Sequence, residues 1–144
     1  MLASICILSF AIFIKSLADP FYVDELEKLL DDKTDKWDVE ELKNNDDMTR
    51  WAKFRSLRRI LLKQTPEVKS KYRQMVISER RRHDEKIDEK LHRATDPKIR
   101  EFWREIFKID TNVHISESEA AEQVFQLLAQ LTPSQRKSVG KVCQ

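Results

Sequence analysis

The spacing of apolar residues along the chain is helical throughout. Apolar positions recur every three or four residues, and no segment alternates apolar and polar residues over a useful length. We therefore predict an all-α fold: a compact array of about six short-to-medium helices, including one long charged helix, with no β-sheet. The predicted helices cover about Phe21–Leu30, Trp37–Leu42, Arg50–Lys63, Pro66–Leu91, Pro97–Ile109 and Glu117–Leu131, and a last one begins at Pro133.

Several helix starts carry a capping signature. A short polar residue before a proline favours a helix that begins at the proline, because the side chain accepts a backbone hydrogen bond and proline needs no donor there. Such pairs are Asp19–Pro20, Thr65–Pro66, Asp96–Pro97 and Thr132–Pro133. Capping-box spacing occurs at Ser116 with Glu119 and at Thr132 with Gln135.

The apolar stripes predict which helix faces are buried. On the helix 50–63 the residues expected to point inward are Trp51, Phe54, Leu61 and Leu62. The helix 97–109 should be the most buried, through Ile99, Phe102, Trp103, Ile106 and Phe107. A short loop joins it to the helix 117–131, so these two helices should pack together. The facing residues would be Val124, Leu127, Leu128 and Leu131.

Composition narrows the classes of function. The chain has 144 residues, which is room for one domain; charged residues make up 36%, and glycine occurs once. These numbers exclude a glycine-rich phosphate loop, a dinucleotide fingerprint and a glycine-bearing calcium loop. The histidines His83, His92 and His114 lack close spacing, and no serine sits in a glycine-bounded turn. We expect no enzymatic activity and no cofactor.

The first eighteen residues have the pattern of a secretory signal peptide. Leu2–Ile14 is an uncharged, mostly apolar run of thirteen residues, which is too short to span a bilayer. Ser16 and Ala18 place small residues where signal peptidase requires them, which predicts cleavage between Ala18 and Asp19. We expect the remainder to be soluble, secreted and extracellular; a buried N-terminal core helix is the alternative.

Cleavage there would leave one cysteine. Cys6 departs with the signal peptide, and Cys143 stays, second from the end of the chain. A single cysteine cannot form an internal disulfide, but it can link two chains. We therefore expect either a monomer with a free terminal thiol or a dimer linked through Cys143.

Charge divides the rest of the chain into blocks. Residues 19–49 carry twelve acids and four bases, a net charge of −8, whereas residues 50–108 carry nineteen bases and nine acids, a net charge of +10. The acidic segment can therefore lie on the basic one within the same molecule. The predicted organisation is a signal peptide (1–18), an acidic N-terminal helical arm (19–47) and a helical domain (48–144).

Two basic clusters lie in predicted helices. Arg80, Arg81 and Arg82 are consecutive, so they spread around the helix, and the acids that follow offer them partners four residues away. We interpret this run, with His83 beside it, as an exposed helix surface. The alternatives are a nucleic-acid-binding patch, or processing of a peptide precursor here and at Arg58–Arg59.

The loop after residue 109 resembles part of a calcium site. Asp110, Asn112 and Glu119 echo ligand positions of an EF-hand loop, but two residues and the turn glycine are missing. Calcium requires six to eight oxygen ligands, and this loop offers about four. We predict that Ser116 and Glu119 cap the next helix instead and that no metal binds.

Six aromatic residues are the candidates for an apolar binding site. They recur at helical spacing and can line a cavity for an apolar ligand, although such stripes are more often plain core. The six are Trp51, Phe54, Phe102, Trp103, Phe107 and Phe125.

The order of these motifs resembles a known family. In chain order the motifs are Trp51-Ala52, Pro66-Glu67-Val68-Lys69-Ser70-Lys71-Tyr72, Thr95-Asp96-Pro97, Ile115-Ser116, Leu131-Thr132-Pro133 and Arg136-Lys137-Ser138-Val139. From about Met48 to Val142 the chain resembles the SXP/RAL-2 family (DUF148 domain) of secreted nematode proteins. The resemblance implies an excreted or surface-associated helical protein with no established enzymatic activity, for which binding of divalent ions or small apolar ligands has been considered.

These observations predict a binding protein. We expect a secreted, non-enzymatic helical protein of the SXP/RAL-2-like type that binds an unidentified protein. A carrier of a small apolar ligand is the alternative, and a basic peptide precursor or a nucleic-acid-binding module is the third hypothesis. We expect no nucleic-acid partner, and no membrane contact once the signal peptide is removed.

Overall fold

The structure, a computed structural model, describes residues 22–141. Seven helices form there: α2 (Val23–Glu27), α3 (Lys33–Asn44), α4 (Arg50–Lys63), α5 (Pro66–Arg93), α6 (Pro97–Thr111), α7 (Glu117–Ala129) and α8 (Pro133–Lys141). These residues form no strand, so the predicted all-α fold is confirmed. None of these helices is long and apolar enough to cross a bilayer. The predicted signal peptide, its cleavage site at Ala18 and Asp19, and Cys143 lie outside the described residues.

Capping side chains form as predicted at four helix starts, whereas the Asp19–Pro20 pair lies outside the described residues. Thr65 and Asp96 each accept a backbone N–H of the first turn of the helix that follows. Reciprocal capping boxes form at Ser116 with Glu119 and at Thr132 with Gln135.

Some helix boundaries differ from the prediction. Helix α3 is longer than expected because Asp32 accepts the backbone N–H groups of Thr34 and Asp35 at 2.9 and 3.0 Å. This cap begins the helix four residues before the predicted start at Trp37. Helices α2 and α7 are shorter than predicted and end at Glu27 and Ala129.

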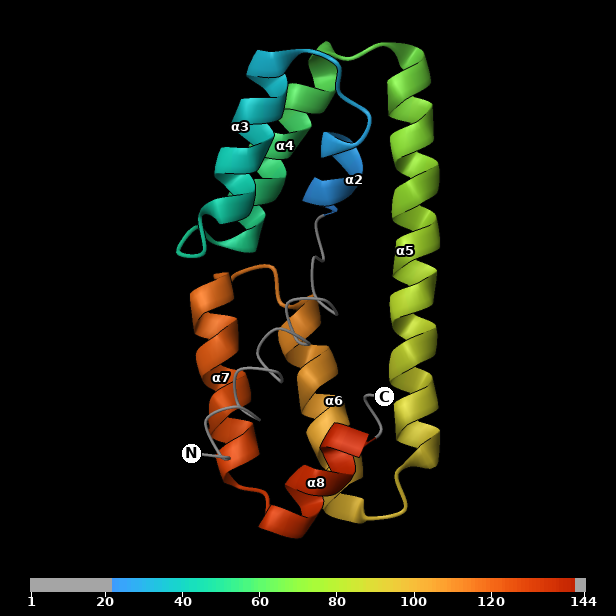
Figure 1. Ribbon diagram of the computed structural model, residues 1–144, viewed down its shortest axis with the longest axis vertical. Coiled ribbons are helices and arrows are strands. Elements are labelled where there is room, and N and C mark those ends of the chain that lie inside the picture. The colour runs from blue at the N-terminus through green and yellow to red at the C-terminus, as the bar shows by residue number, and fades with distance from the viewer. Residues whose placement is uncertain (1–21, 142–144) are drawn as a thin grey trace.

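Two helical hairpins that meet tip to tip define the architecture (Figure 1). Hairpin α3–α4 lies at one end, hairpin α6–α7 lies at the other, and their connecting loops meet in the middle. The long helix α5, about 42 Å at 1.5 Å per residue, runs beside both hairpins. The loops are joined by backbone hydrogen bonds from Arg50 to Ile115 (3.0 Å), from Trp51 to Val113 (2.8 Å) and from Ser118 to Asp46 (3.0 Å).

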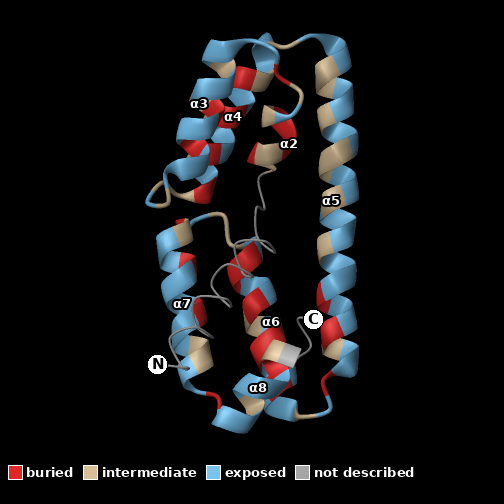
Figure 2. Ribbon diagram, in the orientation of Figure 1, coloured by how far each residue is buried: buried red, intermediate tan, exposed pale blue. Residues whose placement is uncertain are grey.

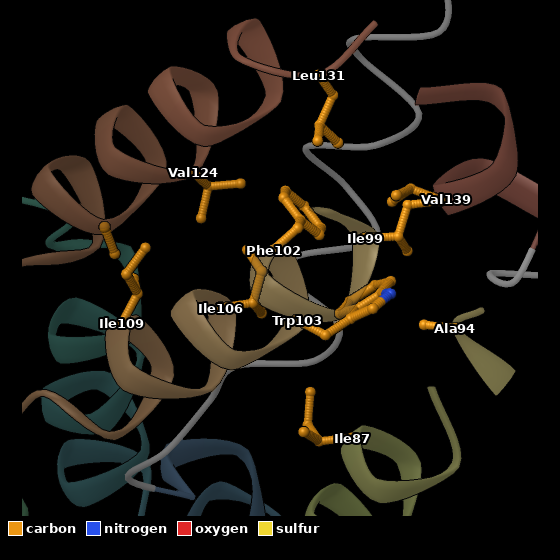
Figure 3. Close-up of a cluster of buried hydrophobic side chains, with 11 residues drawn as sticks. Ile87, Ala94, Ile99, Phe102, Trp103, Ile106, Ile109, Val124, Leu131 and Val139 are labelled. Carbon is orange, nitrogen blue, oxygen red and sulfur yellow. The ribbon is translucent and has the colours of Figure 1, made fainter. Parts of the chain in front are cut away.

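Each hairpin has its own apolar core (Figure 2). The α3–α4 core consists of Val23, Leu26, Leu30, Val39, Leu42, Leu57 and Ile60. The α6–α7 core consists of Ile87, Ala94, Ile99, Phe102, Trp103, Ile106, Ile109, Ala120, Val124, Leu131 and Val139 (Figure 3). Because most of the first core comes from residues 23–42, the acidic arm is packed into the fold. Helix α5 contributes to both cores.

Helix α6 buries more residues than any other described helix, as predicted. Its buried residues include Phe102 and Trp103, whose rings meet edge to face at 5.2 Å between centroids. Phe107 is the exception: it was predicted on the buried stripe but is exposed at the edge of the helix, where it stacks on His83 of α5.

The prediction for helix α4 was wrong about which face is buried. Trp51, Phe54 and Leu62 were expected to point inward, but they are 48%, 38% and 63% exposed. The buried residues of α4 are Arg50, Lys53, Leu57 and Ile60. This helix carries two apolar stripes, one with Leu57 and Ile60 and one with Trp51, Phe54 and Leu62. The first stripe is buried because it lies on the same side as Arg50, whose side chain binds the α6–α7 hairpin.

Candidate functional site

The six aromatic residues predicted for a ligand cavity do not come together. Phe102 and Trp103 are buried in the α6–α7 core, whereas Trp51 and Phe54 lie exposed on α4. The other two, Phe107 on α6 and Phe125 on α7, are also exposed. The structure therefore divides the set between a core and several surfaces.

One face of α4 carries exposed apolar and basic side chains together. We define the α4 face as Trp51, Phe54, Arg55, Arg58 and Leu62, all of which are exposed. Spacings of three, four and seven residues place them on one side of the helix, opposite Ile60. The rings of Trp51 and Phe54 stack, with centroids 5.8 Å apart and an interplanar angle of 25°.

The arginines of the α4 face have no counter-charge within residues 22–141. Arg55 and Arg58 form no ion pair or side-chain hydrogen bond with the residues the structure describes, because α4 contains six basic residues and no acid. Several exposed bases of α5 and α6 instead pair with an acid three or four residues away. These pairs are Lys71–Glu67, Arg82–Glu79, Arg93–Glu89, Arg104–Glu101 and Lys108–Glu105. The α4 face thus carries a positive charge that no acid of residues 22–141 neutralises through an ion pair.

A groove between α3 and α4 has the volume of a small ligand. It encloses about 340 Å³ and is lined by Asp38, Glu41, Leu42, Asn45, Met48, Ser56, Arg59, Ile60 and Lys63. Ligand sites for apolar molecules are lined mostly by apolar side chains. Two acids and two bases in this lining make the groove a poor match for an apolar ligand.

Arg50 joins the two hairpins from a buried position. Its guanidinium is 1% exposed and donates five hydrogen bonds. Nε and Nη2 bind the two carboxylate oxygens of Glu117 at 2.8 and 3.1 Å. Nη1 binds the main-chain oxygens of Ile109, Asp110 and Asn112 at 2.5, 3.3 and 3.2 Å. The guanidinium therefore caps the C-terminal end of α6 and neutralises the acid at the start of α7.

Sequence reasoning missed Arg50, although one signal was present. The first turn of a helix has a partial positive charge, so a basic residue at the first helical position is unfavourable unless something compensates for it. Arg50 occupies that position in α4. Its compensation comes from Glu117, 67 residues further along the chain, which the sequence pattern does not reveal.

The three residues considered for calcium each make a contact within the protein. The Asp110 carboxylate lies 3.3 Å from Nε2 of His83. The side-chain oxygens of Asn112 and Glu119 accept backbone N–H groups from His114 and Ser116. Among residues 22–141 no group of three or more histidine, cysteine, aspartate or glutamate residues could hold a metal ion.

His83 is not the surface residue that the sequence predicted. Its side chain is mostly buried, its Nε2 faces Asp110 Oδ2 at 3.3 Å, and its ring stacks on Phe107 at 6.4 Å between centroids. The hydrogen bond with Asp110 raises the pKa of His83, while burial opposes this effect and the charges of Asp110 and Asp84 add to it. The pair joins the middle of α5 to the end of α6.

The stability of the fold is expected to depend on pH through His83. Because the folded-state pKa lies above the unfolded value of about 6.5, the stabilisation is complete below that pH and is lost as pH rises through the raised pKa. His83→Gln should therefore cost about 1 kcal/mol at about pH 5.5 and close to nothing at about pH 8.5. Urea unfolding at both pH values measures this difference.

His92→Gln is the matched control for that measurement. His92 is exposed and contacts only a main-chain oxygen of its own helix, that of Asp88. Its replacement should therefore have the same small effect at both pH values. A cost of His83→Gln that does not change with pH would contradict the assignment.

Comparison of the chain with protein-family models, with curated proteins and with solved structures finds no match. The resemblance to the SXP/RAL-2 family therefore rests on the sequence motifs alone.

Proposed function

We propose that the protein is a secreted, non-enzymatic interaction protein whose binding surface is the α4 face. One observation carries the proposal: one exposed helix face combines large apolar side chains with arginines that form no ion pair among the described residues. Clustered apolar residues on a surface mark interaction sites more often than isolated ones do. Tryptophan and arginine are also the residues that contribute most to binding energy at interfaces.

The signal-peptide pattern and the SXP/RAL-2 resemblance support the extracellular part of this proposal. The signal-peptide pattern indicates export, and the resemblance implies an excreted helical protein without established enzymatic activity. The carrier hypothesis has less support, because the groove of suitable volume is lined by four charged residues. The peptide-precursor hypothesis also has less support, because Arg58–Arg59 and Arg80–Arg82 lie inside helices α4 and α5.

An anionic aromatic probe, anilinonaphthalene sulfonate, tests the α4 face directly. The probe carries an apolar ring system and a sulfonate, so it should bind beside Trp51 and Arg58. We expect Trp51→Ala with Leu62→Ala to weaken probe binding about thirtyfold or more, since tryptophan truncations at binding surfaces cost about 2 kcal/mol or more. Fluorescence titration measures the affinity. The thermal midpoint should barely change, because exposed substitutions alter stability within about 0.5 kcal/mol.

Two further variants decide between a surface and a cavity. Trp37 on α3 is also an exposed tryptophan, but it lies among acids, so Trp37→Ala should leave probe binding unchanged. Ser56→Phe places a bulky side chain in the α3–α4 groove. Probe binding that survives the α4-face substitutions and is lost in Ser56→Phe would favour the carrier hypothesis instead.

A further inference from the structure

The α4 face is a strip of exposed side chains in which two arginines lie between apolar residues. From Trp51 to Leu62 the strip extends over about 16 Å of helix. Arg55 and Arg58 lie between the aromatic pair at one end and Leu62 at the other. A partner must therefore offer both apolar contact and negative charge along the whole strip.

The surface of an anionic bilayer meets both requirements at once. Headgroup phosphates and carboxylates accept hydrogen bonds from guanidinium groups, and the acyl-chain boundary lies about 5–10 Å below them. Tryptophan is enriched at this depth because its ring is amphipathic. Basic helices that also expose Trp, Phe and Leu are typical of proteins that lie on a membrane surface.

We propose that the α4 face docks on membrane surfaces that contain anionic phospholipids. This inference rests on the proposed function, for which it names the partner. It also revises the expectation that the exported chain has no membrane contact. The reason is that Trp51, Phe54 and Leu62, which were expected to point inward, lie on the surface.

Two other exposed aromatic residues, Trp37 and Phe125, lack the charge that this partner requires. Trp37 lines a shallow hollow with Glu40, Glu41 and Asp47, so an anionic surface would repel it. Phe125 lies one helical turn from Glu122, on a helix whose first turn is also acidic. The α4 face instead combines exposed apolar side chains with arginines that make no ion pair among the described residues.

Vesicle co-sedimentation of the full chain tests the proposal. The vesicles are phosphatidylcholine alone, or phosphatidylcholine mixed with phosphatidylserine. The protein should bind the mixed vesicles selectively, and added salt should weaken the binding because it screens the charges. Arg55→Gln with Arg58→Gln should reduce the affinity about 25-fold, or about fivefold per arginine near the surface. Trp51→Ala should reduce it roughly tenfold.

Matched variants separate docking from general electrostatic attraction. Arg80→Gln with Arg81→Gln removes the same charge from an exposed part of α5, and Trp37→Ala removes an exposed tryptophan from α3. Both should bind the mixed vesicles like the unchanged protein. All samples keep the same N-terminal segment, so any binding through that segment is common to them. Equal losses in the α4-face and control variants would overturn the proposal.

Tryptophan fluorescence reports the depth of docking. The chain contains three tryptophans, and Trp103 is buried. In a Trp37→Phe protein, brominated phospholipids should therefore quench the emission of Trp51. Quenching that needs phosphatidylserine in the vesicles supports docking; binding without quenching overturns it.

The vesicle and probe experiments together distinguish failure of the membrane inference from failure of the proposed function. If the sulfonate probe binds at the α4 face but the mixed vesicles do not bind the protein, the membrane inference is wrong and the interaction surface stands. An acidic protein would then be the partner to seek. If neither the probe nor the vesicles respond to the α4-face substitutions, both proposals are wrong.

Discussion

Replacing Arg50 with methionine is expected to lower the free energy of unfolding by about 3 kcal/mol. Methionine has a similar length but no donor, so the main-chain oxygens of Ile109 and Asn112 lose the hydrogen bonds that they accept from the guanidinium. The carboxylate of Glu117 loses its counter-charge as well, although its partial exposure lets water replace some of that interaction. Denaturant unfolding followed by circular dichroism measures the loss.

A double-mutant cycle shows whether the loss comes from the pair. Glu117→Leu alone leaves a buried guanidinium without its carboxylate. Arg50→Met together with Glu117→Leu removes both charges, so its cost should be smaller than the sum of the two single costs. Arg55→Met is the control for loss of an exposed arginine, and it should change stability by about 0.5 kcal/mol or less. Additive costs would show that the pair is not coupled.

Arg50 also connects stability to the proposed binding surface. Its buried contacts fix the rotation of α4 about its own axis, and Leu57 and Ile60 follow it into the α3–α4 core. The opposite side of the helix then carries Trp51 and Arg58 outward. The exposure of the α4 face is therefore a consequence of how the two hairpins are joined.

The parts of the fold that depend on neighbouring residues could be predicted from the sequence. Asp96 and Pro97 begin α6 because capping requires only the residues of one turn. The core of α6 could be predicted because its apolar residues form one stripe, which leaves a single way to bury the helix. The bounds of α4 were predicted correctly for the same local reasons.

The parts that depend on distant residues could not be predicted. In α4 the apolar residues form two stripes, so the pattern does not decide between Trp51 inward and Ile60 inward. The deciding contact is with Glu117, on another hairpin. His83 was misjudged for the same reason, because its partner Asp110 lies 27 residues away and arrives only when α5 packs on α6. The sequence therefore singled out Trp51 and Phe54 as candidate binding residues, but it did not predict that they lie on an exposed surface.

Trp103→Ala is expected to cost about 3–5 kcal/mol, the usual loss when a buried tryptophan is truncated to alanine. Trp103 is 2% exposed at the centre of the α6–α7 core, and the Nζ of the buried Lys90 lies 4.1 Å from its ring centroid. The alanine variant loses the edge-to-face contact with Phe102 and leaves Lys90 beside a cavity. A whole domain has about 5–15 kcal/mol of stability, so this loss removes a large share of it and raises the unfolded fraction of the protein.

Trp103→Phe measures the effect of removing part of the side-chain volume while keeping an aromatic ring. The indole N–H of Trp103 donates to no residue that the structure describes, so phenylalanine removes volume but no hydrogen bond between described residues. Its cost should therefore be well below that of alanine, and circular dichroism with denaturant titration would rank the two variants. Trp51→Ala, on the exposed α4 face, should be close to neutral. A Trp103→Ala protein that stays folded but loses binding of an apolar probe would mean that Trp103 lines a ligand cavity, and the carrier hypothesis would then replace the α4 face as the proposed function.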